Sequence, residues 1–483
     1  MAAGRTTSQN IGLALGPTLA VAIALLPLPE GLTPEGLRVA ALLAWMAVWW
    51  STEAIPIPAT SLLPIVFLPL IGGGTANEAA EAYFSTTVVL LLGGFVVAMG
   101  IERWNLHKRI ALNIVAASGD RLKLITAGFM IATAVISAWI SNTATTIMMV
   151  PIALSVATST GDRDGQFSKA LLLGICYAAS IGGVATPIGT PTNLIAIKWL
   201  EENAGATIGF PQWMAFGVPA MLLLIPLAWF VVTRGMATRA GAGVGGSARD
   251  TVLSELRGLG KITTQESRVA MIFGVVATLW VIRVPVQSLL EGVPGLGWVQ
   301  SIGDMGIAIF GAVLTFLIPA GGGEKRAVLN WEEAERLPWG VLMLFGGGIS
   351  IGRAVSRTGL SEWIGSELAF LEGAPAILIV LVVVLLVVYL TEVTSNVATM
   401  TTLAPILGSF ALGLGIAPES LLGPAAVAAS CAFMLPVATA PNAIVYASGK
   451  ITMAQMIRAG FWINVGAVVI ITIVGTFLAP LVL

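Results

Sequence analysis

The chain has 483 residues, of which 57% are hydrophobic and only 10% charged, and its mean hydropathy is +0.92. Soluble domains carry about 25% charged residues, so this composition excludes an ordinary soluble protein and predicts a polytopic membrane protein. The formal net charge of −1 argues against a nucleic-acid partner, which needs a basic face. Cys176 and Cys431 lie in apolar stretches and are predicted to be core residues, without a disulfide or a metal.

Apolar runs predict the helices in chain order. The first run, 11–29, contains prolines and lacks a clear cleavage site, so we expect a retained N-terminal transmembrane helix within residues 1–35 rather than a signal peptide. Further runs occupy 38–50, 55–72, 84–101, 171–200, 212–232, 269–287, 302–320, 338–355, 423–447 and 460–482. The basic, partly glycine-rich segment 233–268 is predicted to be a flexible cytoplasmic linker between residues 36–232 and 269–483.

Two apolar stretches are too long for one membrane crossing. Residues 124–161 contain no charged residue and centre on Ser141-Asn142-Thr143, whereas residues 373–418 contain only Glu392 and centre on Ser395-Asn396. A helix rises about 1.5 Å per residue and the hydrocarbon layer is about 30 Å thick, so each stretch should fold back near its middle. We therefore predict two re-entrant hairpins with the polar residues at their apices.

The surroundings of the two apices are similar. Gly93-Gly94 precedes the first hairpin and Gly346-Gly347 the second, while a Pro/Asn segment follows each, at 185–193 and at 438–442. Three elements repeated in the same order predict an internal repeat, as found in secondary transporters.

Charge predicts that the two repeats are inverted. Residues 102–123 hold more basic than acidic residues, and residues 353–372 hold more acidic than basic residues. Positively charged loops stay in the cytoplasm, so the first hairpin is predicted to enter from inside and the second from outside. A site between their apices could then be reached from both faces of the membrane.

The apices suit an anion and cations together. Helices that begin at Asn142 and Asn396 would direct unsatisfied N–H groups and partial positive charge at an anion between them. The broken helices near 189–193 and 439–442 would expose carbonyl oxygens, which suit a hard cation such as sodium. Neither apex contains Lys or Arg, so a bound dianion needs accompanying mobile cations.

These motifs together resemble the divalent anion/sodium symporter family of di- and tricarboxylate transporters. The resemblance covers nearly the whole chain and rests on the following segments: Ser51 to Pro56, Trp104 to Leu112, Ser141-Asn142-Thr143, Thr391 to Asn396 and the two Pro/Asn breaks. It implies an all-α, ion-transporter-like fold of about eleven transmembrane helices plus two re-entrant hairpins. It also implies a homodimer of elevator type in the inner membrane of a bacterial cell. In one departure, Val397 stands where the family often has Thr.

The resemblance also implies particular ligands. Ser137, Ser141, Asn142 and the Gly189 carbonyl would form a first sodium site, and Thr391, Thr394, Asn396 and the Ala438 carbonyl a second. The substrate residues would be Asn142, Thr143, Thr190, Ser395, Asn396 and Thr439. The implied function is sodium-coupled symport of C4-dicarboxylates, with sodium as the coupling ion and no other cofactor.

Several alternatives stay open at this point. The polar apices could be exposed turns, and an anion exchanger, a citrate or sulfate symporter or an ion channel would fit a similar cradle. An enzyme is not expected, because the sequence offers one distant histidine and no paired acids. Glu53 and Glu392 are candidates for buried carboxylates, and for Glu392 we expect a structural bond to backbone rather than a proton-transfer role. The run Gly346 to Gly348 is predicted to permit close helix packing.

Overall fold

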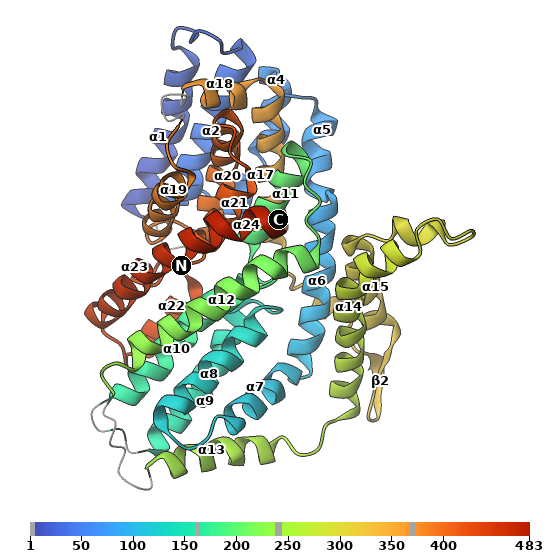
Figure 1. Cartoon of the computed structure of the whole chain (residues 1–483), viewed down its shortest axis with the longest axis vertical. Coiled ribbons are helices and arrows are strands. Elements are labelled where there is room, and N and C mark those ends of the chain that lie inside the picture. The colour runs from blue at the N-terminus through green and yellow to red at the C-terminus, as the bar shows by residue number, and fades with distance from the viewer. Residues whose placement is uncertain (1–4, 161, 163–164, 237–243, 368–372) are drawn as a thin grey trace.

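The computed structural model describes residues 5–160, 162, 165–236, 244–367 and 373–483 (Figure 1). Parts of two predicted segments, the linker residues 237–243 and residues 368–372 before the second hairpin, lie outside the described residues. The described chain is mostly helical. One two-stranded antiparallel sheet, which the prediction of an all-α protein missed, interrupts it.

The described residues between 5 and 236 form twelve α-helices and one short 3₁₀ turn. In chain order these are α1 (Thr7–Ala24), α2 (Pro34–Thr52), α3 (Ile57–Thr60), α4 (Leu63–Ile71), α5 (Ala76–Glu81), η1 (Ala82–Phe84), α6 (Thr86–Arg103), α7 (Leu106–Ala117), α8 (Leu122–Ser137), α9 (Asn142–Ser159), α10 (Gln166–Gly183), α11 (Pro191–Asn203) and α12 (Phe210–Thr233). The α8–α9 pair is the first predicted hairpin. Ser141 is the residue that precedes α9, so the chain turns at the predicted apex.

The rest of the described chain contains twelve more α-helices. They are α13 (Val244–Gly258), α14 (Thr264–Leu289), η2 (Gly297–Ser301), α15 (Asp304–Leu317), strands β1 (Pro319–Gly321) and β2 (Glu324–Ala327), α16 (Trp331–Ala334), α17 (Trp339–Arg357), α18 (Leu360–Glu367), α19 (Ala376–Leu390), α20 (Asn396–Gly413), α21 (Glu419–Ala429), α22 (Ala440–Ala447), α23 (Met453–Phe477) and α24 (Ala479–Val482). The α19–α20 pair is the second hairpin, and Ser395 precedes α20 as predicted.

Five helical stretches of the described residues are long and apolar enough to cross a membrane. They are Ala76–Arg103, Phe210–Thr233, Thr264–Leu289, Trp339–Arg357 and Met453–Val482. The hairpin helices Leu122–Ser137 and Ala376–Leu390 are apolar but shorter. Breaks divide other apolar runs into pieces, as at Gly183 and Pro191, where α10 stops and α11 begins. The expected total of about eleven spanning helices therefore stays a prediction.

The two hairpins lie in different halves of the molecule. In the view of Figure 1, α8 and α9 occupy the lower half, and α19 and α20 the upper left. Helix α10 packs against α8 and α9, and α21 packs against α19 and α20. Each hairpin is thus supported by the helix that leads into a break.

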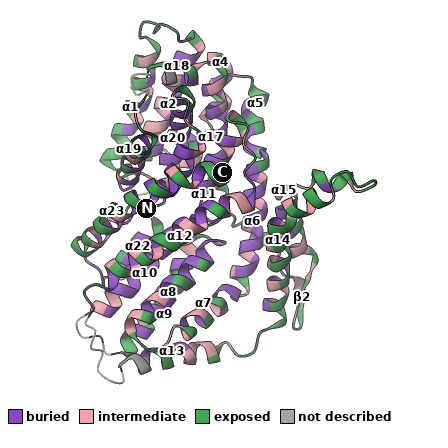
Figure 2. Ribbon diagram, viewed as in Figure 1, coloured by how far each residue is buried: buried purple, intermediate pink, exposed green. Residues whose placement is uncertain are grey.

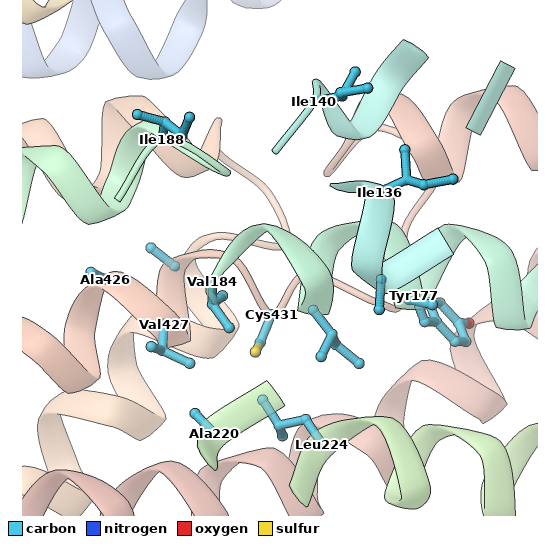
Figure 3. Packing of buried hydrophobic residues seen from close by; sticks show 14 of the residues in the cluster. Ile136, Ile140, Tyr177, Val184, Ile188, Ala220, Leu224, Ala426, Val427 and Cys431 are labelled. Carbon is cyan, nitrogen blue, oxygen red and sulfur yellow. The ribbon is translucent and has the colours of Figure 1, made fainter. Parts of the chain in front are cut away.

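The interior lies around α10 and α21, and Figure 2 shows buried residues along the helices that face one another. Cys176 of α10 and Cys431 after α21 are fully buried and unpaired, as predicted. Figure 3 shows Cys431 among Val184, Val427 and the α12 residue Leu224. Cysteine acts here as a small apolar residue.

Glycines allow the close contacts predicted for the run Gly346 to Gly348. A Cβ atom at each of these positions would overlap a neighbour: Tyr83 at Gly346, Ser61 at Gly347 and Thr401 at Gly348. Helix α17 consequently lies directly against the segments around η1 and α3. Only glycine leaves room for these approaches.

Two expectations need correction. The segment predicted to be a flexible linker contains α13, which packs against α7 and α9, so residues 244–258 are ordered helix. Glu53 is exposed rather than buried, because α2 ends at Thr52 and Glu53 adopts a left-handed conformation in the turn.

Candidate functional site

One cavity of about 290 Å³ brings both apices and both helix breaks together. Its lining includes nine of the predicted ligands: Ser141, Asn142, Thr143, Gly189, Thr190, Ser395, Asn396, Ala438 and Thr439. Its other lining residues are Gly94, Phe95, Ala98, Trp139, Ser180, Ile188, Pro191, Pro338, Val341, Val397, Ala440 and Pro441. None of these described lining residues is charged. The cavity therefore offers hydroxyl, amide and carbonyl groups in an otherwise apolar wall.

Three predicted ligands do not line the cavity. Ser137, Thr391 and Thr394 lie behind the apices, at the ends of the incoming hairpin helices. The Thr394 hydroxyl donates to the Leu390 carbonyl and also contacts the Thr399 hydroxyl. The structure therefore gives Thr394 two protein partners and no place in the cavity wall.

Ser137 and Thr391 hold the two apical asparagines in the same way. The Ser137 hydroxyl lies 2.6 Å from Asn142 Oδ1 and 2.7 Å from the Ala179 carbonyl oxygen. The Thr391 hydroxyl lies 2.8 Å from Asn396 Oδ1 and 2.9 Å from the Ala429 carbonyl oxygen. Each contact fixes the amide oxygen of an asparagine against the helix that precedes a break.

This arrangement leaves donors available in the cavity. Within the described residues, the Nδ2 groups of Asn142 and Asn396 have no protein acceptor, and the hydroxyls of Ser141 and Ser395 have no hydrogen-bond partner. An asparagine amide nitrogen carries two donor hydrogens and a serine hydroxyl carries one. These groups can bind the oxygens of a carboxylate.

Asparagines inside the second helix of each broken pair hold the breaks open. Asn193 Nδ2 donates to the Gly183 and Thr186 carbonyls, at 3.0 and 2.7 Å. Asn442 Nδ2 donates to the Ala432 and Leu435 carbonyls, at 2.9 and 3.0 Å. The acceptors lie ten and seven residues before the asparagine in both cases. The same side chain thus satisfies carbonyls that a continuous helix would have paired with backbone N–H groups.

Two of the predicted sodium ligands lie together beside Gly183. A Cβ atom at Gly183 would lie 2.9 Å from Asn142 Oδ1 and 3.1 Å from the Gly189 carbonyl oxygen. Glycine therefore leaves a position close to two oxygens that were both predicted as sodium ligands. Oxygen donors of this kind are those that hard cations prefer. In the second half the residue that corresponds to Gly183 is Ala432, two positions after Ser430, because the carbonyl of each accepts from the asparagine ten residues later.

Ser180 is a site residue that the sequence did not reveal. It lines the cavity, is 1% exposed, and its hydroxyl has no hydrogen-bond partner among the described residues. A buried hydroxyl without a partner is unfavourable, so a bound ligand would satisfy it. Ser180 lies within the apolar run 171–200, with no motif around it to mark it as functional.

Trp139 connects the first apex to two other helices. Its ring stacks on Phe210, with centroids 5.8 Å apart, and meets Phe273 edge to face at 5.1 Å. Phe210 in turn stacks on Trp280 at 4.2 Å. Trp139 also lines the cavity, so the aromatic cluster ties the apex of the first hairpin to α12 and α14.

Glu392 is bound to backbone, as expected. Its carboxylate accepts hydrogen bonds from the N–H groups of Phe433, Met434 and Leu435, at 2.7 to 3.1 Å, and from Asn464 Nδ2 at 2.7 Å. The side chain is 4% exposed and does not line the cavity. Glu392 is therefore a positioning residue for the second break.

The helical fold, the apolar helices that are long enough to cross a membrane and the neutral cavity between two helix breaks are together typical of a secondary transporter. The chain belongs to the sodium:sulfate symporter family, whose transmembrane-region model matches residues 8–483. This match confirms the resemblance found in the motifs. Proteins of this family are multi-pass membrane transporters, not enzymes.

Curated relatives are similar in sequence to this chain over nearly its whole length. The sodium-dependent dicarboxylate transporter SdcS of Staphylococcus saprophyticus is 41% identical over 485 residues, which cover 98% of this chain and 92% of the relative. SdcS of Staphylococcus aureus strain MRSA252 is 41% identical over 490 residues, which cover 99% of this chain and 92% of the relative.

Two solved structures share the fold at low sequence identity. MtrF of Neisseria gonorrhoeae, described as one of a class of antimetabolite efflux pumps, aligns with a TM-score of 0.58 and 15% identity over 97% of this chain and 94% of its own. The YdaH transporter of Alcanivorax borkumensis aligns with a TM-score of 0.58 and 14% identity over 97% of this chain and 96% of its own. At such identity the likeness shows the fold alone.

Proposed function

We propose that this chain is a sodium-coupled symporter of C4-dicarboxylates. The observation that carries the proposal is the neutral cavity in which two Ser-Asn apices face two broken helices. Apical amide and hydroxyl donors would bind the substrate carboxylates, and the oxygens behind them would bind sodium. The SdcS relatives, named as sodium-dependent dicarboxylate transporters, support the same function.

Charge supports the coupling to sodium. A dicarboxylate brings about two negative charges into a region where an unpaired charge costs several kcal/mol. None of the described cavity residues is Lys or Arg, and helix ends supply only about half a charge each. Mobile cations must therefore enter with the substrate.

We propose one cation site in each hairpin–break unit. At the first, Asn142 Oδ1 and the Gly189 carbonyl share the space beside Gly183, and Ser141 lines the same cavity. At the second, Asn396 Oδ1 is held by Thr391, and Ala438 lines the cavity. Ser137 and Thr391 would act by positioning the asparagine oxygens, with their own hydroxyl oxygens available as further ligands.

The remaining parts of the proposal concern movement and assembly. Two inverted repeats, 36–232 and 269–483, would present the cavity alternately to each side of a bacterial inner membrane. The aromatic contacts of Trp139 with Phe273, and of Phe210 with Trp280, would lie between a moving part and a static scaffold of an elevator. A homodimer would supply a stable scaffold. An exchanger and a citrate or sulfate symporter are the alternatives.

Uptake into proteoliposomes tests the proposal. Labelled succinate should accumulate under an inward sodium gradient, with lithium a poorer substitute and potassium inactive. Malate and fumarate should compete, and citrate and sulfate should compete weakly. Accumulation in sodium-free medium under a proton gradient alone would contradict the proposal. Exchange without net accumulation under a sodium gradient would instead support the exchanger.

A further inference from the structure

A second hollow, distinct from the transport cavity, opens where α10, α12 and α23 come together. Its volume is about 870 Å³. Lys169 from the first turn of α10, Arg234 from the end of α12 and Arg458 from α23 line it, together with Gln166 and Gln455. Helix α12 packs against both α10 and α23, on the lower left of Figure 1. Three helices thus each direct one basic residue to the same hollow.

The three charges are not neutralised by the described part of the protein. Neither Lys169, Arg234 nor Arg458 forms an ion pair with a described carboxylate, whereas Lys108, Arg109 and other basic residues do. Lys169 Nζ donates only to Gln166 Oε1, at 2.8 Å. None of the described residues that line the hollow is acidic. A phosphate group would balance the charge, because its oxygens accept hydrogen bonds from both Lys and Arg.

The rim of the hollow is apolar and belongs to membrane-spanning helices. Phe230 of α12 is 57% exposed and Trp462 of α23 is 54% exposed, and both line the hollow. Their helices lie in the stretches Phe210–Thr233 and Met453–Val482, which are long and apolar enough to cross a membrane. A soluble anion needs no such rim, whereas a lipid brings acyl chains that cover exposed aromatic side chains.

The side of the membrane agrees with a lipid ligand. The hollow lies near the start of the first hairpin, because Trp229, next to the lining residue Phe230, donates its indole N–H to the Lys123 carbonyl at 2.8 Å. The positive-inside rule assigns the basic residues before that hairpin to the cytoplasm. The cytoplasmic leaflet is rich in anionic lipids, and basic pockets between transmembrane helices on that side bind their headgroups.

We propose that this hollow binds the headgroup phosphate of an anionic phospholipid. Lys169, Arg234 and Arg458 contact the phosphate oxygens, and the acyl chains lie along Phe230 and Trp462. The bound lipid links α10, whose other end reaches the transport cavity, to α12 and α23.

Lipid retention measured by native mass spectrometry tests the proposal. The full-length protein is equilibrated with mixed vesicles of phosphatidylglycerol and phosphatidylcholine, extracted in mild detergent, and its retained lipids are counted. The test variant is the triple substitution Lys169→Gln, Arg234→Gln and Arg458→Gln. The matched control removes three basic residues outside the hollow, by Arg121→Gln, Lys123→Gln and Arg257→Gln. A second variant, Lys169→Arg, Arg234→Lys and Arg458→Lys, keeps all three charges.

We expect the native protein, the control and the charge-keeping variant to retain phosphatidylglycerol in preference to phosphatidylcholine. In the triple Gln variant the ratio of retained phosphatidylglycerol to phosphatidylcholine should fall at least tenfold, since each membrane-facing cation contributes roughly a fivefold factor. If the triple Gln variant does not fold, the single Gln variants take its place. Each should show a smaller fall in the preference for phosphatidylglycerol than the one expected for the triple variant, and the charge-keeping variant should show no fall.

Three results would overturn the proposal. The first is equal retention by the triple Gln variant and the native protein. The second is displacement of the bound phosphatidylglycerol by inorganic phosphate, at concentrations that leave the other retained lipids in place. Such displacement would mark a site for a free anion. The third is a change of oligomeric state in the triple Gln variant with no change in lipid retention, which would mark the hollow as a contact between two copies.

Discussion

The two hairpin–break units hold their apical asparagines alike, and an asparagine bridges each break in the same way, but the further contacts that fix the breaks differ. In the first unit the Thr186 hydroxyl donates to the Ala138 carbonyl and accepts from the Gly189 N–H, so one neutral side chain joins apex and break. In the second unit the Glu392 carboxylate accepts from three consecutive N–H groups and from Asn464. A longer break exposes more donors, and a carboxylate has enough acceptor capacity to satisfy them.

A second difference concerns two serines at corresponding places. Ser180 follows Ala179, the acceptor for Ser137, and Ser430 follows Ala429, the acceptor for Thr391. The Ser430 hydroxyl lies 3.0 Å from the Thr192 hydroxyl, whereas the Ser180 hydroxyl has no described partner and lines the cavity. We therefore expect the contacts that both units share to serve transport in the same way. The contacts that differ should make the two proposed cation sites unequal.

The largest effect should come from the shared contacts. Asn142→Ala and Asn396→Ala should each lower uptake by roughly a hundredfold or more, because each removes hydrogen bonds to charged ligands worth about 1.5–3 kcal/mol apiece. Uptake into proteoliposomes measures the loss, and size-exclusion chromatography checks that the protein is folded. Near-native uptake in one variant alone would break the equivalence of the two halves.

The next effect concerns stability and should separate the two breaks. Glu392→Ala should destabilise the protein by about 3 kcal/mol or more, because it leaves several buried donors unsatisfied at about 1–3 kcal/mol each. Thr186→Val should cost about 1–2 kcal/mol, because it removes one donor and one acceptor. Thermal unfolding in detergent compares the two variants. Equal losses would show that the carboxylate has no special role in the longer break.

A smaller effect should distinguish the two serines. Ser180→Ala should raise the sodium concentration for half-maximal uptake by about fivefold, since one hydrogen-bonding or ligating hydroxyl contributes about 1 kcal/mol. The matched variant Ser430→Ala should leave the sodium dependence unchanged, because Ser430 already has a protein partner. Identical sodium curves for Ser180→Ala and the native protein would show that the Ser180 hydroxyl does not contact a bound cation.

The smallest effect should come from the one difference between the apical motifs. Val397 lines the cavity where the first motif has Thr143. Val397→Thr should alter apparent affinity or preference among succinate, malate and citrate by about two- to fivefold without abolishing transport, because it adds one hydroxyl beside a working site. Competition assays measure the change. Unchanged inhibition by every competitor would show that position 397 does not contact the substrate.

The sequence predicted much of the site because its signals are local. Charge-free stretches too long for one crossing located both hairpins, and the polar residues at their centres located the helix starts at Asn142 and Asn396. The Pro/Asn segments likewise marked both breaks. These features depend on residues that are close together in the chain.

What the sequence missed depends on contacts between distant segments. Ser180 carries no local signal, and only the packing of α10 beside the apex places its hydroxyl in the cavity. The backbone partners of Glu392 lie about forty residues further along the chain. Glu53 was misassigned because hydropathy does not reveal that α2 ends one residue before it. The helix α13 was missed because its amphipathic surface is stabilised by packing against α7 and α9.

In the proposed mechanism each hairpin–break unit binds a cation that balances the dianion in a neutral cavity. The most direct test is the sodium-to-succinate ratio, obtained from the sodium gradient that just balances an opposing succinate gradient at a set membrane potential. We expect at least two sodium ions per dianion, and a lower ratio for the residual transport of Asn142→Ala or Asn396→Ala. A native ratio of one or less, or balance set by the proton gradient instead, would contradict it.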